Sequence, residues 1–424
     1  LFQFRLRLLS DTTRVVGLSA TVTNADELAA WLGAELLRSD WRPTVLVSQI
    51  IGYDGTGSYH EIEVAKDAAL LPIVEEITSE GPGSKGSIAG SALIFVGAKG
   101  AARAVAAKIA GVPNVADEQE VSTACLAKGV GFHYRGAPHA DEALNRFRRR
   151  ELRVLVGTSG LSTGINVPAR AVIVRDLSLG MSLIDVAQVQ QMFGRAGRAG
   201  LEDEGFAYLL APYAEREHWQ QRLADGYTAV SQLDGHLADV ALAEIHLGSV
   251  GSVDDLARWY STTYSASRSS GTAASLKELL SRLVDAGLVV HHNQDDIRIT
   301  ELGTLTCQLM VEVESAVGMI RELSGTPVPS SARAAELAVL GGVARGAVPF
   351  RERQVNPRTW QPIVDGLLAE LSIPAAQGPF GSQLSLAAAG LALASPERLR
   401  VGTRIANTST LPLREVVEDL PRYL

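Results

Sequence analysis

The sequence predicts an α/β protein, with a parallel sheet in its first half and a mostly helical second half. Two observations carry that prediction. Over residues 42–225, short apolar runs typical of buried parallel strands alternate with helical patterns. From residue 239 onward helical patterns dominate, and two alternating segments at 287–291 and 296–300 are typical of a two-stranded wing.

Each element of the predicted sheet rests on a local pattern. Strands are expected from apolar runs at 14–18, 44–48, 92–96, 130–134, 153–156 and 171–174. Helices are expected from periodic patterns at 24–32, 65–79, 101–110, 141–149 and 182–193, the first with Asn24 as its N-cap. In such sheets ligands bind at the carboxyl ends of the strands, so functional residues are expected in the loops that follow them.

Composition limits the class of protein. The chain has 424 residues, enough for two to four domains, and its 46% hydrophobic and 20% charged residues are typical of a globular protein. Cys125 and Cys307 are too far apart in the sequence to form a disulfide framework and fit a reducing cytoplasm. No signal-peptide layout and no apolar stretch of bilayer length is found. The net charge of -8 excludes a global positive field, although a local channel can still bind nucleic acid.

One stretch, residues 190–200, combines glycines with Arg195 and Arg198 just after the predicted helix 182–193. Two arginines three positions apart on a helical turn would point the same way. Paired guanidiniums suit a polyphosphate, because each can donate to two oxygens and neither loses its charge. The alternative is a surface turn with two solvated arginines.

Residues 153–170 form an apolar run followed by a loop rich in Gly, Ser and Thr. Here the chain resembles superfamily 2 helicases, in the branch that holds the Ski-type RNA helicases and the archaeal repair DNA helicases. Residues 158–168 resemble motif V of that branch, and residues 191–198 resemble motif VI, Q-M-x-G-R-A-G-R. Near the start, 17–21 with Asn24 and 31–33 resemble motif III and its sequel.

The resemblance implies a RecA-like motor domain and a role for each matched residue. Nucleic acid would be contacted by Thr158, Ser159 and Lys99, the last at the motif IV position where arginine is more usual. Gly164 and Asn166 would face the nucleotide, and Gln191, Arg195 and Arg198 would reach its γ-phosphate, with Arg198 as the arginine finger. Ser19, Ala20 and Thr21 would couple the ATP state to strand movement. ATP and Mg²⁺ are the implied cofactors.

The chain departs from the family pattern in three places. It has neither a P-loop nor a D-E-x-H box, since 81–87 lacks the required spacing and 141–144 lacks the final histidine. The rest of the ATP and Mg²⁺ site would therefore come from an N-terminal segment or a protein partner, and this chain alone is expected not to hydrolyse ATP. After His133, Tyr134 and Arg135 replace the second histidine and the alanine of F-H-H-A-G. Residues 176–185 form either a strand-separating hairpin or a plain linker.

Four domains are expected by this resemblance: the end of a first RecA-like domain (1–41), a second RecA-like helicase domain (42–225), a winged helix (232–310) and a helical, ratchet-like domain (311–424). His133 is a candidate catalytic base or a structural histidine. The wing either binds DNA or acts as a brace. Trp360 and Arg353 either touch a strand of nucleic acid or take part in packing.

The expected function is that of the C-terminal portion of an ATP-dependent helicase or translocase. Closure of two RecA-like domains would move it along one strand of single-stranded or partly duplex nucleic acid, with DNA preferred to RNA as the partner. The alternative is a non-catalytic pseudo-helicase that serves as a scaffold or as a nucleic-acid-binding module. No membrane partner is expected.

Overall fold

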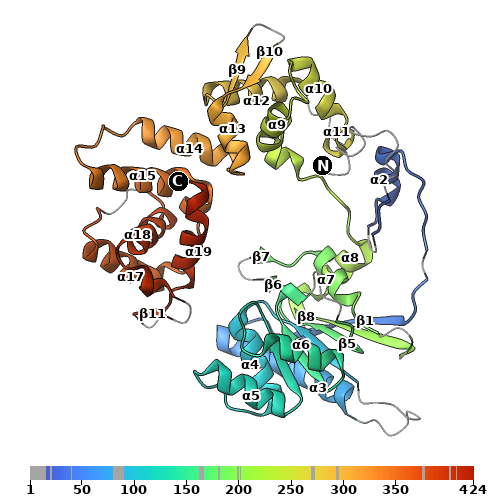
Figure 1. The fold of residues 1–424 in the computed structure, drawn as a ribbon. Coiled ribbons are helices and arrows are strands. Elements are labelled where there is room, and N and C mark those ends of the chain that lie inside the picture. Colours follow the sequence, from blue (N-terminus) through green and yellow to red (C-terminus); the bar gives the residue numbers. More distant parts are fainter. Residues whose placement is uncertain are drawn as a thin grey trace. The chain divides into compact units, whose positions relative to one another are not determined.

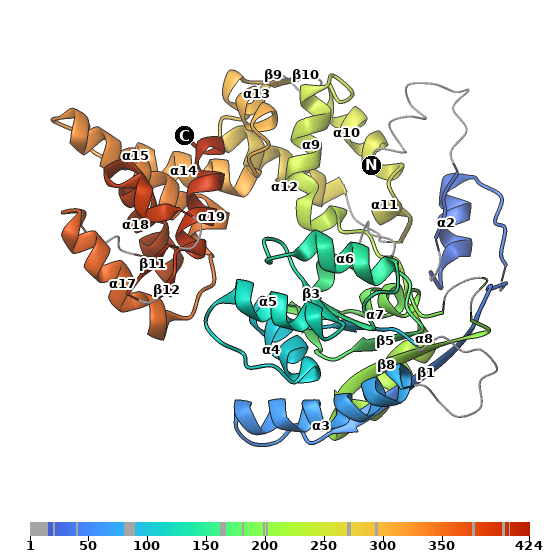
Figure 2. The same ribbon diagram turned by 60° about the horizontal axis from the view of Figure 1, so that its bottom comes forward.

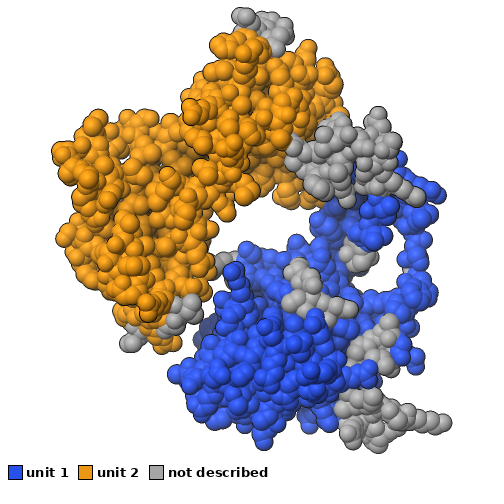
Figure 3. All heavy atoms as spheres, in the orientation of Figure 1, with its two compact units in different colours: residues 1–229 blue, residues 230–424 orange. Residues whose placement is uncertain are grey.

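A computed structural model describes residues 16–19, 22–39, 41–79, 90–161, 167–179, 182–197, 200, 202–268, 273–292, 296–374, 378–400, 403–406 and 408–424 (Figure 1). The chain divides into two compact units, residues 1–229 and residues 230–424, which Figure 3 distinguishes by colour. Each unit is described by itself. The finer division into four domains stays a prediction.

The first unit is built on one six-stranded parallel sheet. Its order is β1-β8-β5-β2-β4-β3. The strands are β1 (Val45–Tyr53), β2 (Ala92–Phe95), β3 (Val130–His133), β4 (Val154–Gly157), β5 (Ala171–Val174) and β8 (Glu204–Pro212). The four residues of β2, β4 and β5 are all buried, which is why their sequences are continuous apolar runs. The expected parallel α/β sheet is confirmed.

Helices cover both faces of this sheet, and Figure 2 shows α3 and α6 on opposite sides. One face packs on α3 (Tyr59–Thr78), α4 (Lys99–Ala110) and α5 (Glu118–Ala127). The other packs on α6 (Ala140–Arg148), α7 (Val186–Phe193) and α8 (Arg216–Asp225). Neighbouring strand residues alternate between the two cores, as Leu93 and Ile94 do. The result is a three-layered α/β/α unit with strand carboxyl ends along one edge.

The segment before β1 differs from expectation in two ways. Val16 and Leu18, predicted to lie in a buried strand, are exposed, and residues 16–19 belong to no strand. A strand needs a hydrogen-bonded neighbour, and no strand in the described residues pairs with this one. Asn24 precedes α2 (Ala25–Leu32) without a side-chain cap bond. Its amide instead bonds both the C=O and the N–H of Ala229, at 2.9 Å each, which satisfies the side-chain donor and acceptor together.

The segment between β5 and α7 forms a hairpin, so residues 176–185 are not a plain linker, and a strand-separating role stays a prediction. Strands β6 (Ser178–Leu179) and β7 (Ser182–Leu183) pair antiparallel. The predicted helix 182–193 therefore begins at Val186, four residues late. Asp185 and Gln188 form a capping box there, with each side chain accepting a hydrogen bond from the other residue's backbone N–H.

The second unit begins with helices and a wing. After the 3-10 turn η3 (Leu233–His236) come α9 (Leu237–His246), α10 (Val253–Ser261), α11 (Tyr264–Arg268) and α12 (Ala273–Asp285). Strands β9 (Val289–His292) and β10 (Asp296–Ile299) then pair antiparallel, as expected for the wing. Thr300 caps α13 (Glu301–Gln308) by accepting a hydrogen bond from Gly303 N–H at 3.0 Å.

The rest of the second unit is helical. It contains α14 (Val313–Ser324), α15 (Ala332–Gly346), α16 (Val348–Arg351), α17 (Pro357–Glu370), α18 (Phe380–Ala394) and α19 (Leu411–Asp419), with the short strands β11 (Arg404–Ile405) and β12 (Thr408–Ser409). Trp360 is buried in its core and Arg353 pairs with Glu415 at 2.5 Å, so both take part in packing. No described helix is both long enough and apolar enough to cross a membrane.

Candidate nucleotide and nucleic-acid sites

The carboxyl edge of the sheet gathers four of the loops that the sequence singled out. Strands β5, β2, β4 and β3 are neighbours and parallel, so the loops that follow them lie side by side. Lys99 follows β2, His133 ends β3, Thr158 and Ser159 follow β4, and the hairpin follows β5. The structure thus brings together the three residues proposed to contact nucleic acid.

Lys99 is exposed at the first position of α4. Its ammonium lies 6.0 Å from the centre of the Tyr134 ring, which in turn stacks on Phe132 at 5.9 Å. The ring face attracts the cation and holds it over the loop that follows β3. Lys99 therefore presents its charge at the carboxyl edge.

Thr158 and Ser159 are half-buried where the chain turns into the 3-10 helix η1 (Ser159–Leu161). The N–H of Thr158 donates to the C=O of His133 at 3.3 Å, and the C=O of Thr158 accepts from Leu161 N–H at 3.1 Å. These bonds fix the turn against β3. A tight turn that carries two hydroxyls suits a sugar-phosphate backbone, which such groups contact without reading bases.

His133 lies beside a cavity of about 410 Å³ whose lining also includes Arg135, His139 and Asp141. Burial lowers the pKa of His133 from its ordinary value, and the neighbouring Asp141 opposes that shift. A lowered pKa fits both a packed histidine and a neutral base, so the two alternatives for His133 stay predictions.

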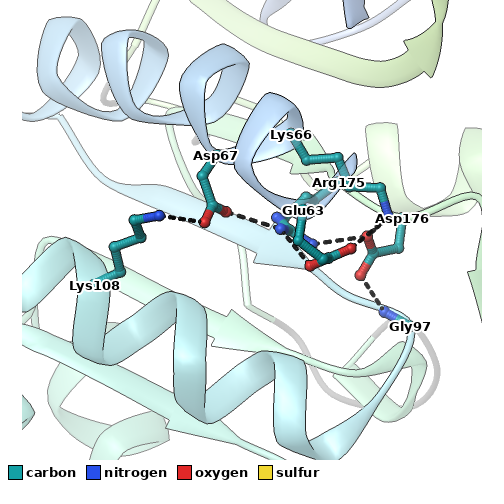
Figure 4. Close-up of polar contacts among 7 residues, drawn as sticks. All are labelled: Glu63, Lys66, Asp67, Gly97, Lys108, Arg175 and Asp176. Carbon is teal, nitrogen blue, oxygen red and sulfur yellow. Dashed lines mark hydrogen bonds and ion pairs between the residues drawn. The ribbon is translucent and has the colours of Figure 1, made fainter. Parts of the chain in front are cut away.

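A cluster of buried charges lies behind this edge, and sequence analysis did not foresee it (Figure 4). Arg175, directly after β5, has an exposed fraction of 1% and donates to Glu63 and Asp67 of α3, at 2.8 Å each, and to Asp176 at 2.9 Å. Asp176 also accepts from Lys66 at 2.9 Å. The available signal was an Arg-Asp pair directly after an apolar strand, where a charge must find partners.

The amino edge of the sheet holds the residues that resemble motif VI. The N–H of Ala169, just before β5, donates to Arg195 C=O at 3.0 Å, and Gly197 N–H donates to Ala169 C=O at 2.7 Å. Ala169 and Ala196 thereby form a parallel bridge. Helix α7 ends at Phe193, so Arg195 is not helical. The helical spacing assumed for the two arginines therefore does not hold at Arg195, and with Arg198 outside the described residues their alignment stays a prediction.

Two further contacts fix this turn. Gly197 has a φ of +85°, and a Cβ there would lie 2.4 Å from the hydroxyl oxygen of Thr44, so only glycine fits. The Arg42 guanidinium donates to the C=O of Ala196 at 3.1 Å and approaches that of Phe193 at 3.5 Å. Arg42 thus satisfies the carbonyl of Ala196, whereas that of Phe193 also accepts from Ala196 N–H at 3.0 Å. Its role was not foreseen, since its partners lie far along the sequence.

Arg195, one of the two arginines expected to reach a phosphate, lies at this edge. Arg195 is half-buried, and burial lowers the pKa of its guanidinium from the ordinary value; Gln191 is exposed on α7. Within the described ranges no group of three or more His, Cys, Asp or Glu side chains is placed to hold a metal ion. Gly164, Asn166, Arg198, Ala20 and Thr21 lie outside the described residues, and Ser19 is exposed.

The two groups of residues therefore lie at opposite edges. Strand β5 (Ala171–Val174) lies between the Ala169 bridge and the Arg175-Asp176 pair, and its four residues span about 10 Å at roughly 3.3 Å per residue. Lys99, Thr158 and Ser159 lie at one end of that span, and Arg195 lies at the other.

Comparison of the sequence with known proteins also finds similarity to helicases. Residues 117–200 match the family model of the helicase conserved C-terminal domain. The chain is 32% identical over 417 residues to the ATP-dependent DNA helicase Hel308 of Pyrobaculum calidifontis, covering 87% of this chain and 56% of that protein. It is 30% identical over 346 residues to the protein of the same name from Thermoplasma acidophilum, covering 75% of this chain and 49% of that protein.

The chain thus spans about half the length of these curated relatives. The matched residues 117–200 include β3, β4, β5 and α7, which build both edges described above. Carrying a helicase conserved C-terminal domain and similar over most of its length to archaeal DNA helicases, the chain resembles the superfamily 2 helicases that its motifs predicted.

Proposed function

We propose that this chain is the part of an ATP-dependent DNA helicase that grips one DNA strand at the carboxyl edge of its sheet and senses nucleotide at the amino edge. The observation that carries the proposal is the backbone pairing of Ala169 with Arg195 and Gly197 at the start of β5. Because β5 continues to the loops of the carboxyl edge, a displacement of the motif VI turn is transmitted along a rigid strand.

The grip is assigned to Lys99, Thr158 and Ser159. The lysine offers a charge to a phosphate, and the turn after β4 offers hydroxyls and backbone N–H groups. None of these contacts depends on base identity, so the grip suits translocation along any sequence. The net charge of -8 makes a diffuse electrostatic attraction to DNA unfavourable, and binding should therefore depend on these local groups.

Nucleotide sensing is assigned to Gln191, Arg195 and, by resemblance, Arg198. ATP bound against them would supply the free energy of phosphoryl transfer. Arg195 suits a γ-phosphate because its guanidinium is partly removed from water and cannot be neutralised, so it stabilises charge that develops in the transition state. The Mg²⁺ ligands and the P-loop lysine would come from residues outside this chain.

Titration of the purified chain with fluorescent single-stranded DNA tests the proposal. Two unrelated sequences are compared at two salt concentrations. We expect equal affinity for both sequences and a clear loss of affinity at higher salt, because each phosphate contact releases counterions. A tenfold preference for one sequence, or affinity that does not change with salt, would contradict a translocating grip.

A further inference from the structure

We infer that Asp176, held in place by Arg175, is a positioning residue that joins the Lys99 loop and the β6–β7 hairpin into one unit. The Lys99 loop is defined as residues 96–99, from the end of β2 to the first residue of α4. The inference rests on the proposed function, because it gives Asp176 a role in the nucleic-acid grip. It also gives a role to the buried ion cluster around Arg175, whose residues are assigned neither to DNA binding nor to nucleotide sensing.

Both carboxylate oxygens of Asp176 are engaged. Oδ2 accepts a hydrogen bond from the backbone N–H of Gly97 at 2.9 Å. Oδ1 accepts from Lys66 Nζ and from Arg175 Nη1, at 2.9 Å each. Gly97 lies two residues before Lys99, so Asp176 holds the backbone of the loop that carries this cation. Figure 4 shows Asp176 between Gly97 on one side and Arg175 on the other.

Arg175 fixes the direction of Asp176. Its second amino group donates to Glu63 and Asp67, which project from α3 on the far side of the guanidinium. Lys66 from α3 and Lys108 from α4 complete the cluster, so that three cations face three carboxylates. Burial lowers the pKa of Arg175 and of Lys66, but the surrounding carboxylates more than offset it and raise both above their ordinary values. Arg175 and Lys66 both bond Oδ1 of Asp176, and both cations are themselves held by Glu63 of α3.

The hairpin meets the same loop. A Cβ placed on Gly97 would lie 2.2 Å from the backbone oxygen of Ser178, the first residue of β6. The loop and the base of the hairpin are therefore in direct contact, and only the absence of a side chain at Gly97 permits it. Asp176 lies two residues before Ser178 in sequence. The backbone N–H of Gly97 donates to Asp176, which gives a second contact between the loop and the base of the hairpin. These two contacts, Gly97 with Ser178 and Gly97 with Asp176, are called the joint.

The joint therefore fixes the positions of both the Lys99 loop and the base of the β6–β7 hairpin. The charge of Lys99 reaches a phosphate only if its loop keeps its place, and a displacement of about 1 Å is enough to lose a well-formed polar contact. Disturbing the joint should therefore resemble the loss of Lys99 itself, although Asp176 is itself negatively charged and touches no nucleic acid in this account.

The test measures the salt dependence of single-stranded DNA binding by the whole chain. Asp176→Ala and Gly97→Ala disturb the joint from its two sides, each alone and combined with Lys99→Ala. Lys99→Ala should lower the slope of log affinity against log salt by about 0.7, the value of one phosphate contact on a single strand. We expect each joint variant to lower the slope by the same amount, and each double variant to show no further loss, since both changes remove one contact.

Two variants serve as matched controls. Lys108→Ala removes a cation from the same helix as Lys99 and from the same cluster, but Lys108 bonds Asp67 and neither Asp176 nor Gly97. Gly100→Ala adds a methyl group in the same helix where a Cβ would meet no atom within 4 Å. Both should keep the wild-type slope. Thermal unfolding of every variant confirms that the fold is retained, and if Asp176→Ala unfolds, Gly97→Ala decides.

The possible results separate the inference from the function on which it rests. If Lys99→Ala lowers the slope while Gly97→Ala and a folded Asp176→Ala keep it, the joint does not position Lys99 and the inference is wrong, although the grip stands. If the wild-type chain shows no salt-dependent binding, or Lys99→Ala keeps the slope, the assigned grip is wrong and the inference falls with it.

Discussion

The two edges of the parallel sheet hold their functional residues by different means. At the carboxyl edge, side-chain charges do the positioning: Arg175, with an exposed fraction of 1%, bonds three carboxylates and so orders the loops that follow β2 and β5. At the amino edge, backbone hydrogen bonds do it: Ala169 pairs with Arg195 and Gly197, and Arg42 satisfies the carbonyl of Ala196.

This difference suits the two proposed tasks. Loops that grip a phosphate backbone must be exposed, and a buried ion cluster behind them supplies rigidity that exposed loops lack. The motif VI turn lies directly against β5, so the strand itself supplies rigidity to the turn that carries Arg195. Removing a residue from one edge should therefore affect one function and spare the other.

The largest expected effect is on ATP turnover at the amino edge. In a version of the protein that also carries a P-loop and an acidic box, Arg195→Ala and Arg198→Ala should each lower turnover on the order of a thousandfold. That factor corresponds to about 4 kcal/mol of transition-state stabilisation. Affinity for single-stranded DNA, measured without nucleotide, should stay near the wild-type value. Turnover that survives while DNA affinity collapses would place these arginines in the grip instead.

The next largest effect concerns stability at the carboxyl edge. Arg175→Ala leaves Glu63, Asp67 and Asp176 without their shared cation, and breaking a buried pair in this way costs about 3–5 kcal/mol. Lys108→Ala removes a half-exposed partner of Asp67 and should cost less than about 1 kcal/mol. Urea unfolding of both variants gives the two values. Equal losses would mean that burial does not distinguish these two members of the cluster.

A smaller effect is expected from Arg42 at the amino edge. Arg42→Ala removes the guanidinium donor to the carbonyl of Ala196 and should lower the free energy of unfolding by about 1 kcal/mol. Arg38→Ala, which removes an exposed ion pair with Asp26 in the same segment, is the control and should change it by less. Urea unfolding compares the two, and a larger loss in the control would show that Arg42 does not hold the turn.

The smallest effect is a pH dependence at the carboxyl edge. Burial lowers the pKa of His133 in the folded state, so the unfolded chain binds this proton more readily. The stabilisation is complete above the ordinary histidine pKa of about 6.5 and is lost as pH falls through the folded-state pKa. Between about pH 7.5 and pH 5, the wild type should therefore lose more stability than His133→Gln in urea unfolding. A variant with the same pH dependence would contradict the depressed pKa.

Much of the fold follows from local patterns, and the exceptions have physical causes. Strand β5 lies where its apolar run predicts, at Ala171–Val174, because a strand buried on both faces needs apolar residues throughout. The start of α7 was misplaced, because the capping box of Asp185 and Gln188 competes with the earlier residues 182–183, which pair in the hairpin. Periodicity alone does not locate such a boundary.

The candidate site was predictable to a lesser degree. Resemblance selected Lys99, Thr158 and Ser159, and the order of the strands places them at one edge; their roles stay predictions. The ion cluster was missed because Arg175 and Asp67 are separated by 108 positions, and only the packing of α3 on the sheet brings them together. Arg42 was missed for the same reason, since 154 positions separate it from Ala196.

The separation of the two edges is tested most directly by one pair of variants in one binding assay. Single-stranded DNA affinity of Lys99→Ala and Arg195→Ala is measured without nucleotide over a range of salt concentrations. We predict that Lys99→Ala lowers the salt slope by about 0.7 and that Arg195→Ala leaves it unchanged, although each removes one positive charge. A loss of slope in Arg195→Ala equal to that in Lys99→Ala would contradict the assignment of DNA and nucleotide to opposite edges of the sheet.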